Sequence, residues 1–336
     1  MDSSMPADPR ISVLVPVYMV ERYIDRCVRS LFGQTMTDSV EFIFVNDCTT
    51  DRSMDILSDL LNQFPALRPQ VRLVNHKENM GLAAARITAL NLAKGEYVIN
   101  LDSDDFFESD MLESMYAAAK SRNADIVVAD YYLSYKNREI YISCPIDSDR
   151  NHLVSNLICN NGGGGRMVWN KLIRRNLYEI HSVKPLPGIN IGEDMIVTAQ
   201  LLFHASTIIK IDRAFAHYNK SNVNTYTSSP RYQDVLKRFT VCDFLADFFE
   251  NQSPEIAEAI NRHRFQIKSL ALIHSPLETQ RQLLAYYPGL TYRKYHQELA
   301  RHWKFPIRLG LNGHLRTFNL IKSIIFKFRT IYRFCR

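Results

Sequence analysis

Short apolar runs alternate with longer segments of helical periodicity through the first hundred residues. Runs rich in β-branched residues are typical of buried strands, and apolar residues that recur every three or four positions are typical of helices. The predicted strands span residues 11–18, 40–47, 71–75 and 98–101, and the predicted helices span residues 20–31, 54–64 and 82–93. Because strands that alternate with helices pair in parallel through right-handed crossovers, we expect an α/β fold with a Rossmann-like, mostly parallel sheet flanked by helices.

Carboxylates follow two of the predicted strands. Asp47 ends the second strand, and Asp102, Asp104 and Asp105 follow the fourth. Ligands of open parallel sheets bind beyond the carboxyl ends of the strands, so these side chains should share one edge of the sheet. Carboxylates this close repel one another, and Mg²⁺ or Mn²⁺ bound by one or two of them and by substrate phosphates would relieve the repulsion. The triplet predicts a metal–diphosphate site, unless Asp104 and Asp105 only cap the next helix, expected near residues 108–112.

A second pair of carboxylates, Glu193 and Asp194, precedes a helical pattern that begins at Met195. An alcohol is a poor nucleophile at neutral pH, so transfer to a hydroxyl needs a general base, and a carboxylate can fill that role. Acidic residues are also favoured at the positive end of a helix without any catalytic part. Both interpretations are open for this pair. A short final strand, residues 207–211, is expected after the helix.

Five segments resemble the motifs of family 2 glycosyltransferases, and they occur in that family's order and at similar spacing. They are SVLVPVY at 12–18, VNDCTTD at 45–51, NMGLAAAR at 79–86, KGEY at 94–97 and DSDD at 102–105. The resemblance covers about residues 10–228 and is to bacterial members of the polysaccharide or capsule type. It implies the GT-A fold and a metal-dependent enzyme that transfers a hexose from a nucleoside-diphosphate sugar.

The resemblance also implies roles for individual residues. A Mn²⁺ or Mg²⁺ site would include Asp104 and His217, and Asp194 would be the base with Glu193 beside it. The nucleotide-sugar site would include ten residues: Pro16, Tyr18, Glu21, Asp47, Asp51, Arg86, Asp102, Ser103, Trp169 and Lys171. Plainer roles are open for several of them: Tyr18 as a half-buried aromatic, Trp169 as a core residue and His217 as a surface histidine. Arg86 could instead pair with Asp47 for stability alone.

Three positions depart from the family's usual pattern. Met19 stands where asparagine is usual, Cys48 replaces a common glycine, and Asn219 stands where relatives often carry arginine. The first two remove no oxygen ligand, so we expect them to change loop geometry or base preference and to leave the fold intact. Asn219 leaves one phosphate contact open.

The resemblance implies a GT-A domain at residues 11–228, with a nucleotide-sugar-binding half at 11–105 and an acceptor and catalytic half at 106–228. The sequence outside it predicts an N-terminal tail at residues 1–10, a helical region punctuated by prolines at 229–300 and a basic amphipathic tail at 301–336. We therefore expect a C-terminal helical extension after the glycosyltransferase domain.

The tail carries a concentrated positive charge. No acidic residue follows Glu298, whereas nine lysines and arginines do. At about 100° per residue, one helix face would hold Lys322, Arg329, Arg333 and Arg336, and the other would hold Ile321, Ile324, Ile325, Phe328, Ile331 and Tyr332. We expect an in-plane anchor on an anionic membrane, or else a helix docked on the protein with a solvated basic face. No nucleic-acid-binding motif accompanies the charge, so nucleic acid is not expected as a partner.

Composition bears on the compartment. The chain has 336 residues and 46% apolar content, enough for one substantial core. The six cysteines show no Cys-x-x-Cys spacing, which favours reduced thiols in the cytosol. Residues 1–10 lack the apolar core of a signal peptide, and no uncharged apolar run reaches the ~18 residues of a membrane span. We expect a cytoplasmic protein that is peripheral at the inner face of the plasma membrane.

These expectations combine into an inverting single displacement. Asp194 would take the proton of a hydroxyl on a glycan or lipid-linked acceptor, and the metal at Asp104 would neutralise the departing nucleoside diphosphate. Two alternatives differ in chemistry. A nucleotidyltransferase would consume a nucleoside triphosphate, and an inactive nucleotide-sugar-binding or membrane-associated scaffold would bind a donor without turnover.

Overall fold

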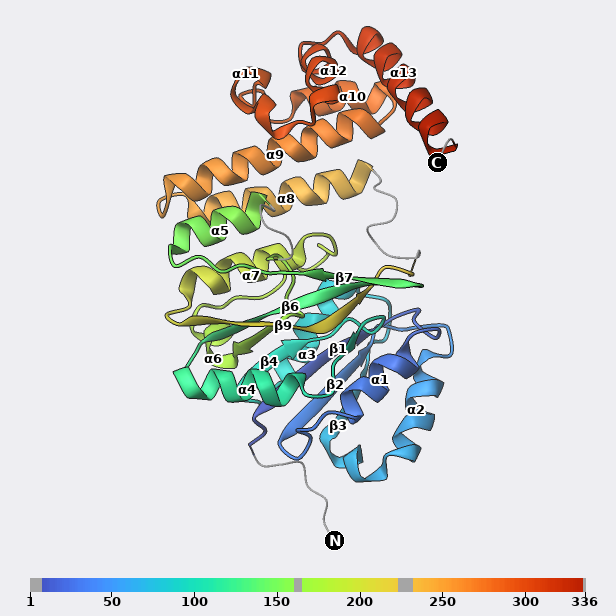
Figure 1. Ribbon diagram of the computed structural model, residues 1–336, viewed down its shortest axis with the longest axis vertical. Coiled ribbons are helices and arrows are strands. Elements are labelled where there is room, and N and C mark those ends of the chain that lie inside the picture. The colour runs from blue at the N-terminus through green and yellow to red at the C-terminus, as the bar shows by residue number, and fades with distance from the viewer. Residues whose placement is uncertain (1–7, 160–164, 223–231, 335–336) are drawn as a thin grey trace. The chain divides into compact units, whose positions relative to one another are not determined.

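The computed structural model describes residues 8–159, 165–222 and 232–334, and the chain divides into two compact units, Met1–Ser228 and Ser229–Arg336 (Figure 1). The first unit contains the sheet, and the described part of the second unit is helical.

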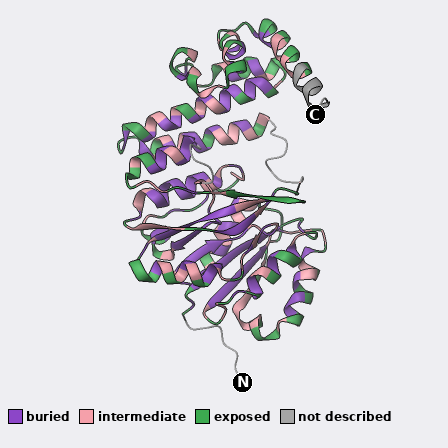
Figure 2. Cartoon of the chain, in the orientation of Figure 1, coloured by how far each residue is buried: buried purple, intermediate pink, exposed green. Residues whose placement is uncertain are grey.

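A parallel sheet forms the N-terminal half of the first unit. Its strands lie in the order β3 (Val71–Asn75), β2 (Val40–Asn46), β1 (Ile11–Val17) and β4 (Tyr97–Asn100), and the connecting helices are α1 (Ile24–Phe32), α2 (Ser53–Gln63) and α3 (Leu82–Leu92), with a 3₁₀ helix at Pro65–Gln70. Every residue of β1 is buried (Figure 2), as is typical of a parallel strand covered on both faces. The predicted strands and helices of this half are confirmed.

The second half of the unit joins the sheet through antiparallel pairs. Its elements are β5 (Phe106–Phe107), α4 (Met111–Arg122), β6 (Ile126–Tyr135), β7 (Arg138–Ile142), α5 (Arg150–Cys159), β8 (Lys171–Arg174), α6 (Arg175–Ile180), α7 (Glu193–His204) and β9 (Ile208–Asn219). Strand β8 pairs antiparallel with both β4 and β6, whereas β6 and β9 are parallel. The prediction of a short strand at 207–211 was wrong in length, because β9 continues along β6 to Asn219 and contains His217.

The order of the strands places a crevice between β1 and β4. After β1 the chain builds β2 and β3 on one side, and it then returns to add β4 on the other side of β1. Ligands of open sheets bind at such a reversal, beyond the carboxyl ends of the strands. Tyr18 follows β1 and Asp102 lies two residues after β4, so the fold brings both to this edge.

The second unit is a helical extension. Its helices are α8 (Tyr232–Phe249), α9 (Pro254–His274), α10 (Leu277–Ala285), α11 (Tyr292–Tyr295), a 3₁₀ turn at His296–Glu298, α12 (Arg301–Leu311) and α13 (Leu315–Phe334). Helix α9 packs against α8, α10 and α12, and its first turn is capped by Ser253, whose Oγ accepts a hydrogen bond from the N–H of Ile256 at 3.3 Å. In the part of the chain that the structure describes, no helix combines the length and apolar character needed to cross a bilayer.

Two of the unusual residues noted in the sequence adopt left-handed backbone conformations. Met19 has φ 54° and Cys48 has φ 58°. A side chain beyond Cβ is unfavourable there, whereas glycine has no penalty and asparagine is tolerated. The two loops are also tied together, because the N–H of Met19 donates to the Oγ1 of Thr49 at 2.8 Å. The two departures therefore place residues with larger side chains on left-handed backbone, which adds strain.

We predict that Cys48→Gly stabilises the protein by up to about 1 kcal/mol, because it relieves a left-handed strain of about 1–2 kcal/mol and is offset in part by the extra entropy of glycine in the unfolded chain. Urea unfolding would measure the change. Cys48→Ala is the matched control, since it removes the sulfur and keeps Cβ. Equal stabilities for the glycine and alanine variants would contradict the strain.

Candidate active site

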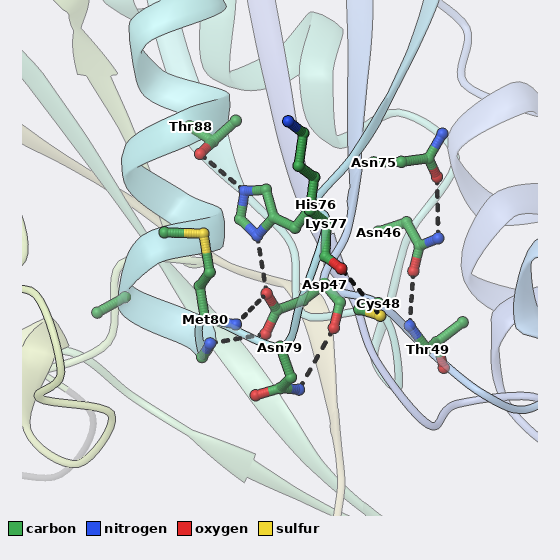
Figure 3. Close-up of polar contacts among 12 residues, drawn as sticks. Asn46, Asp47, Cys48, Thr49, Asn75, His76, Lys77, Asn79, Met80 and Thr88 are labelled. Atoms are coloured by element: carbon green, nitrogen blue, oxygen red, sulfur yellow. Dashed lines mark hydrogen bonds and ion pairs between the residues drawn. The ribbon is translucent and has the colours of Figure 1, made fainter.

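Asp47 organises the loop between β3 and α3 (Figure 3). Its Oδ1 accepts a hydrogen bond from the N–H of Met80 at 2.8 Å, and its Oδ2 accepts one from the N–H of Gly81 at 2.7 Å. The ring of His76 bridges Asp47 and Thr88 at 2.7 and 2.9 Å. Both carboxylate oxygens are thus used within the protein, where they fix the start of α3.

Arg86 lies one turn into α3 and is 4% exposed. Its Nη2 donates to Asp102 Oδ1 at 2.6 Å, and its Nη1 donates to Glu193 Oε1 at 3.0 Å and also to Asp194. The alternative in which Arg86 pairs with Asp47 is therefore not what the structure shows. Burial alone would lower the pKa of Arg86, but Asp194, Asp102 and Glu193 raise it, so the guanidinium stays charged.

The two carboxylates at the start of α7 differ in access to solvent. The side chain of Asp194 is 17% exposed and that of Glu193 is 8% exposed. Burial raises the pKa of Asp194 and the nearby Arg86 opposes that shift, while burial and Asp194 together raise the pKa of Glu193. Asp194 is the more accessible proton acceptor, and Arg86 favours its ionised form.

A cavity of about 20 Å³ adjoins this cluster, and Leu14, Asn100, Tyr178, Arg86 and Asp194 contribute to its lining. The volume is enough for about one water molecule. Among the described residues, the Nε of Arg86 is buried and has no hydrogen-bond partner. The guanidinium is thus fixed through its two terminal nitrogens.

The acidic triplet after β4 is only partly compensated. Burial and Asp102 raise the pKa of Asp104, whose Oδ2 accepts a hydrogen bond from Asn222 at 2.8 Å. Asp105 is buried, its Oδ1 accepts a hydrogen bond from the N–H of Asn219 at 2.7 Å, and burial with Asp104 raises its pKa. Helix α4 begins at Met111, within the expected range, but its N-cap residue is Asp110, so Asp104 and Asp105 do not cap it.

A divalent ion fits this edge chemically. Its donors are hard carboxylate oxygens, and the buried Oδ2 of Asp105 has no hydrogen-bond partner among the described residues. The described part of the chain contains no group of three His, Cys, Asp or Glu side chains arranged around one ion. An ion at Asp104 would therefore need further oxygen ligands, which the phosphates of a donor can supply.

His217 is engaged by other groups. Its Nε2 lies 2.8 Å from Glu108 Oε1 and its Nδ1 lies 2.8 Å from Glu139 Oε1, and the ring stacks on Phe106 with centroids 4.1 Å apart. The ring is buried, so it is not the surface histidine considered from the sequence. A metal at His217 would have to displace one of the two carboxylates.

Trp169 and Lys171 are both buried. Trp169 is 3% exposed and packs against the rings of Tyr131 and Tyr218. The Nζ of Lys171 donates to the carbonyl of Met167 at 2.6 Å, and burial lowers the pKa of this lysine to about 8. Trp169 is thus a core residue, which is one of the two interpretations of the sequence. The amine of Lys171 is bound by a backbone carbonyl within the protein.

The remaining donor-site predictions fall into two groups. Tyr18 is 42% exposed at the edge of the sheet, whereas Pro16 and Ser103 are buried. Glu21 and Asp51 join two loops: the N–H of Glu21 donates to Asp51 Oδ2 at 2.9 Å, and Glu21 Oε2 accepts from the N–H of Arg52 at 3.2 Å. Hydrogen bonds from Ser53, Glu21 and Thr49 lower the pKa of Asp51 although burial opposes them. Tyr18 and Glu21 are thus the exposed members of this group.

Two amide side chains at the same edge were not singled out from the sequence. Asn46 ends β2, and its Nδ2 donates to Asn75 Oδ1 at the end of β3, at 2.9 Å. Its Oδ1 accepts a hydrogen bond from the N–H of Thr49 at 2.8 Å (Figure 3). Their position as last residues of adjacent strands was the available signal.

Comparisons with known proteins show what the chain is similar to in sequence and in fold. The putative glycosyltransferase EpsH of Bacillus subtilis (strain 168) is 32% identical over 238 residues, which are 68% of this chain and 65% of EpsH, so the match spans slightly less than two thirds of that relative. The structure of S. aureus TarS 1–349 in complex with UDP-GlcNAc is similar with a TM-score of 0.68 at 17% identity, over 95% of this chain and 92% of that one.

A second solved structure is similar over nearly the whole chain. The mannosyltransferase PcManGT from Pyrobaculum calidifontis, in complex with GDP-Man and Mn²⁺, gives a TM-score of 0.53 at 17% identity, over 96% of this chain and 88% of that one. These likenesses confirm the predicted GT-A fold with its C-terminal helices. The family model described as "Glycosyl transferase family 2" matches residues 12–180, half of the chain, and the chain therefore belongs to glycosyltransferase family 2.

Proposed function

We propose that this protein transfers a sugar from a nucleoside-diphosphate sugar to a hydroxyl of a glycan or lipid-linked acceptor, with inversion at the anomeric carbon, in the synthesis of a bacterial surface polysaccharide. One observation carries the proposal: a partly exposed carboxylate, Asp194, is held by Arg86 at the same edge as two acidic residues, Asp104 and Asp105, whose pKa values are raised by burial and by neighbouring carboxylates. Asp194 can accept a proton, and the two acidic residues can hold a metal-bound diphosphate.

The protein's own groups would act as follows. Asp194 accepts the proton of the acceptor hydroxyl while that oxygen forms a bond to the anomeric carbon, and the bond from that carbon to the diphosphate oxygen breaks. The proton stays on Asp194 and the electron pair leaves with the nucleoside diphosphate. Burial raises the pKa of Asp194, and Arg86 opposes that shift and holds the side chain in place.

Mn²⁺ or Mg²⁺ at Asp104 would supply charge neutralisation for the departing diphosphate. Asp102 would bind the ribose of the donor, and the exposed ring of Tyr18 lies at the same edge, where a base could pack. The printed ligands of the structural relatives, UDP-GlcNAc for TarS and GDP-Man with Mn²⁺ for PcManGT, support a uridine or guanosine diphosphate sugar as the donor.

We also propose that the second unit meets an anionic membrane surface. Arg316, Leu320, Ile324 and Lys327 are all exposed along one face of α13, and Phe305 of α12 is 60% exposed. Apolar side chains flanked by lysine and arginine suit a bilayer with anionic headgroups, since each basic residue near the surface contributes about 1 kcal/mol. Localisation at the inner face of the plasma membrane would follow from this contact.

This face differs from the one expected from the sequence. The Nζ of Lys322 donates to the carbonyl of Ser275 at 3.2 Å, and burial lowers the pKa of that lysine, so Lys322 is not part of the open face. Leu320 and Ile324 are open instead. The structure describes the side chains of α13 only as far as Lys327, so those of Phe328, Arg329, Ile331, Tyr332, Arg333 and Arg336 lie outside the described part.

We predict that Asp194→Asn lowers turnover by about 10²–10⁴-fold, the usual contribution of a general base, and leaves donor binding within a few-fold of the wild type. Release of nucleoside diphosphate from UDP-N-acetylglucosamine, UDP-glucose and GDP-mannose would measure turnover, and calorimetry would measure binding. Asp212→Asn, at an exposed aspartate on β9, is the control. Undiminished turnover in Asp194→Asn would exclude this base, and release of pyrophosphate from a nucleoside triphosphate would indicate a nucleotidyltransferase.

Removal of the charge at Asp104 should have opposite effects on binding and on stability. In Asp104→Asn, we expect Mn²⁺-dependent binding of the donor to be lost, because the ligand charge is gone. We expect the unliganded protein to become more stable, because burial and Asp102 disfavour this carboxylate in the folded state. Calorimetric titration with Mn²⁺ and with a chelator would test the first effect, and urea unfolding the second. If the affinity for the donor is unchanged by the chelator and by Asp104→Asn, the metal site is refuted.

Vesicle sedimentation would test the membrane contact. We predict binding to vesicles of phosphatidylcholine with phosphatidylglycerol, weak binding to phosphatidylcholine alone, and a loss of about 30-fold for Arg316→Ala with Lys327→Ala, from about 1 kcal/mol for each residue. Leu320→Ser should weaken binding, whereas Leu270→Ser, at an exposed leucine of α9, should not. The same affinity for both kinds of vesicle would contradict the proposal.

A further inference from the structure

Two helix starts that lie far apart in the sequence meet at the site. Helix α3 begins after Gly81 and α7 begins after Gly192. The side chain of Asn190, just ahead of α7, reaches the first turn of α3, where its Oδ1 accepts a hydrogen bond from the N–H of Ala83 at 3.1 Å. The first N–H groups of a helix have no partner within the helix, so Asn190 supplies from a distant segment the cap that Gly81 lacks.

Gly81 is shaped to receive this side chain. Its φ of 87° is unfavourable for other residues, and a Cβ built on it would lie 2.3 Å from the Nδ2 and 2.8 Å from the Oδ1 of Asn190. The carboxamide of Asn190 therefore occupies the space that a side chain at Gly81 would need. The N–H of Gly81 donates to Asp47, which ties the same point to the end of β2.

The same two helix starts carry the ionisable groups of the site. Arg86 lies three residues after Ala83 on α3, and Asp194 lies four residues after Asn190. The ion pair of Arg86 with Asp194 and Glu193 is thus a second link between the same two helix starts. The hydrogen bond from the backbone of α3 to the short side chain of Asn190 allows little variation in the distance between the two helix starts. The ion pairs join longer side chains, which can keep contact in several rotamers while that distance changes.

We propose that Asn190 is a positioning residue, which sets the place of Asp194 relative to Arg86 and to the donor edge fixed by Asp47. The inference rests on the proposed function, in which Asp194 is the base. Correct placement matters for this role because a shift of about 1 Å in a reacting group can lower a rate by about 10²-fold. Asn190 itself touches neither substrate nor the reacting atoms.

The test compares Asn190→Ala with Asn190→Asp, which keeps an oxygen acceptor for the N–H of Ala83. With the donor selected from the panel above, we expect Asn190→Ala to lower kcat by up to about 100-fold with the donor KM within a few-fold of wild type, and Asn190→Asp to recover most of the loss. Lys184→Ala, at an exposed residue earlier in the same loop, is the control. An equal fall in kcat and in the fraction of folded protein would overturn the inference.

A double substitution separates positioning from other effects. If Asn190 acts through Asp194, then Asn190→Ala should cause almost no further loss of kcat in the Asp194→Asn protein. The same fold-loss in both backgrounds would contradict the inference while leaving Asp194 as the base.

Hydrogen–deuterium exchange gives a readout that needs no substrate. Asn190→Ala should speed exchange at residues 83–86 and 193–196, and Lys184→Ala should not. If Asp194→Asn retains full turnover, the proposed function fails, and the exchange data still decide whether Asn190 joins the two helices. Unchanged exchange in Asn190→Ala would refute the link itself.

Discussion

One buried cation organises the acidic edge of this protein. The guanidinium of Arg86 is shared by three carboxylates, Asp102 after β4 and Glu193 and Asp194 at the start of α7. Loss of one partner in a buried ion pair typically costs about 3–5 kcal/mol, because a charge is left without compensation. The interaction therefore stabilises the contact between the two halves of the first unit, which carry these groups on segments about a hundred residues apart.

The acidic residues of this edge form two groups: Arg86 contacts Asp102, Glu193 and Asp194, and it forms no ion pair with Asp104 or Asp105 among the described residues. The groups that touch Arg86 are held in place, and the charge of Arg86 opposes the rise that burial causes in the pKa values of Glu193 and Asp194. Among the described residues, Asp104 and Asp105 form no ion pair. Burial and Asp102 raise the pKa of Asp104, and burial and Asp104 raise the pKa of Asp105. They are thus better suited to a divalent ion that arrives with a diphosphate than to a stable ion pair within the protein. A single arginine can in this way separate the proposed base from the proposed metal site along one edge.

Local patterns in the sequence were sufficient for the parallel half of the sheet and for the positions of Asp102 and Asp194, because strand and helix periodicity are local properties. They were not sufficient for β6 and β8, whose antiparallel pairing depends on contacts between distant segments. The partners of His217 and Arg86 were missed for the same reason. Lys322 shows a further limit, since a helical projection gives the spacing of side chains but not which face docks on neighbouring helices.

Backbone conformation shows what Met19 and Cys48 have in common, which their side-chain chemistry does not. Met19 and Cys48 differ from their usual counterparts in side-chain chemistry, yet both retain the left-handed conformation that asparagine and glycine favour. Strain of this kind persists where the surrounding structure determines the backbone, and here Thr49 and Lys77 contact the two residues. Gly81 shows the converse, because the absence of its side chain leaves room for Asn190. At this edge, the residues that fix the loops thus determine where the ionisable groups can act.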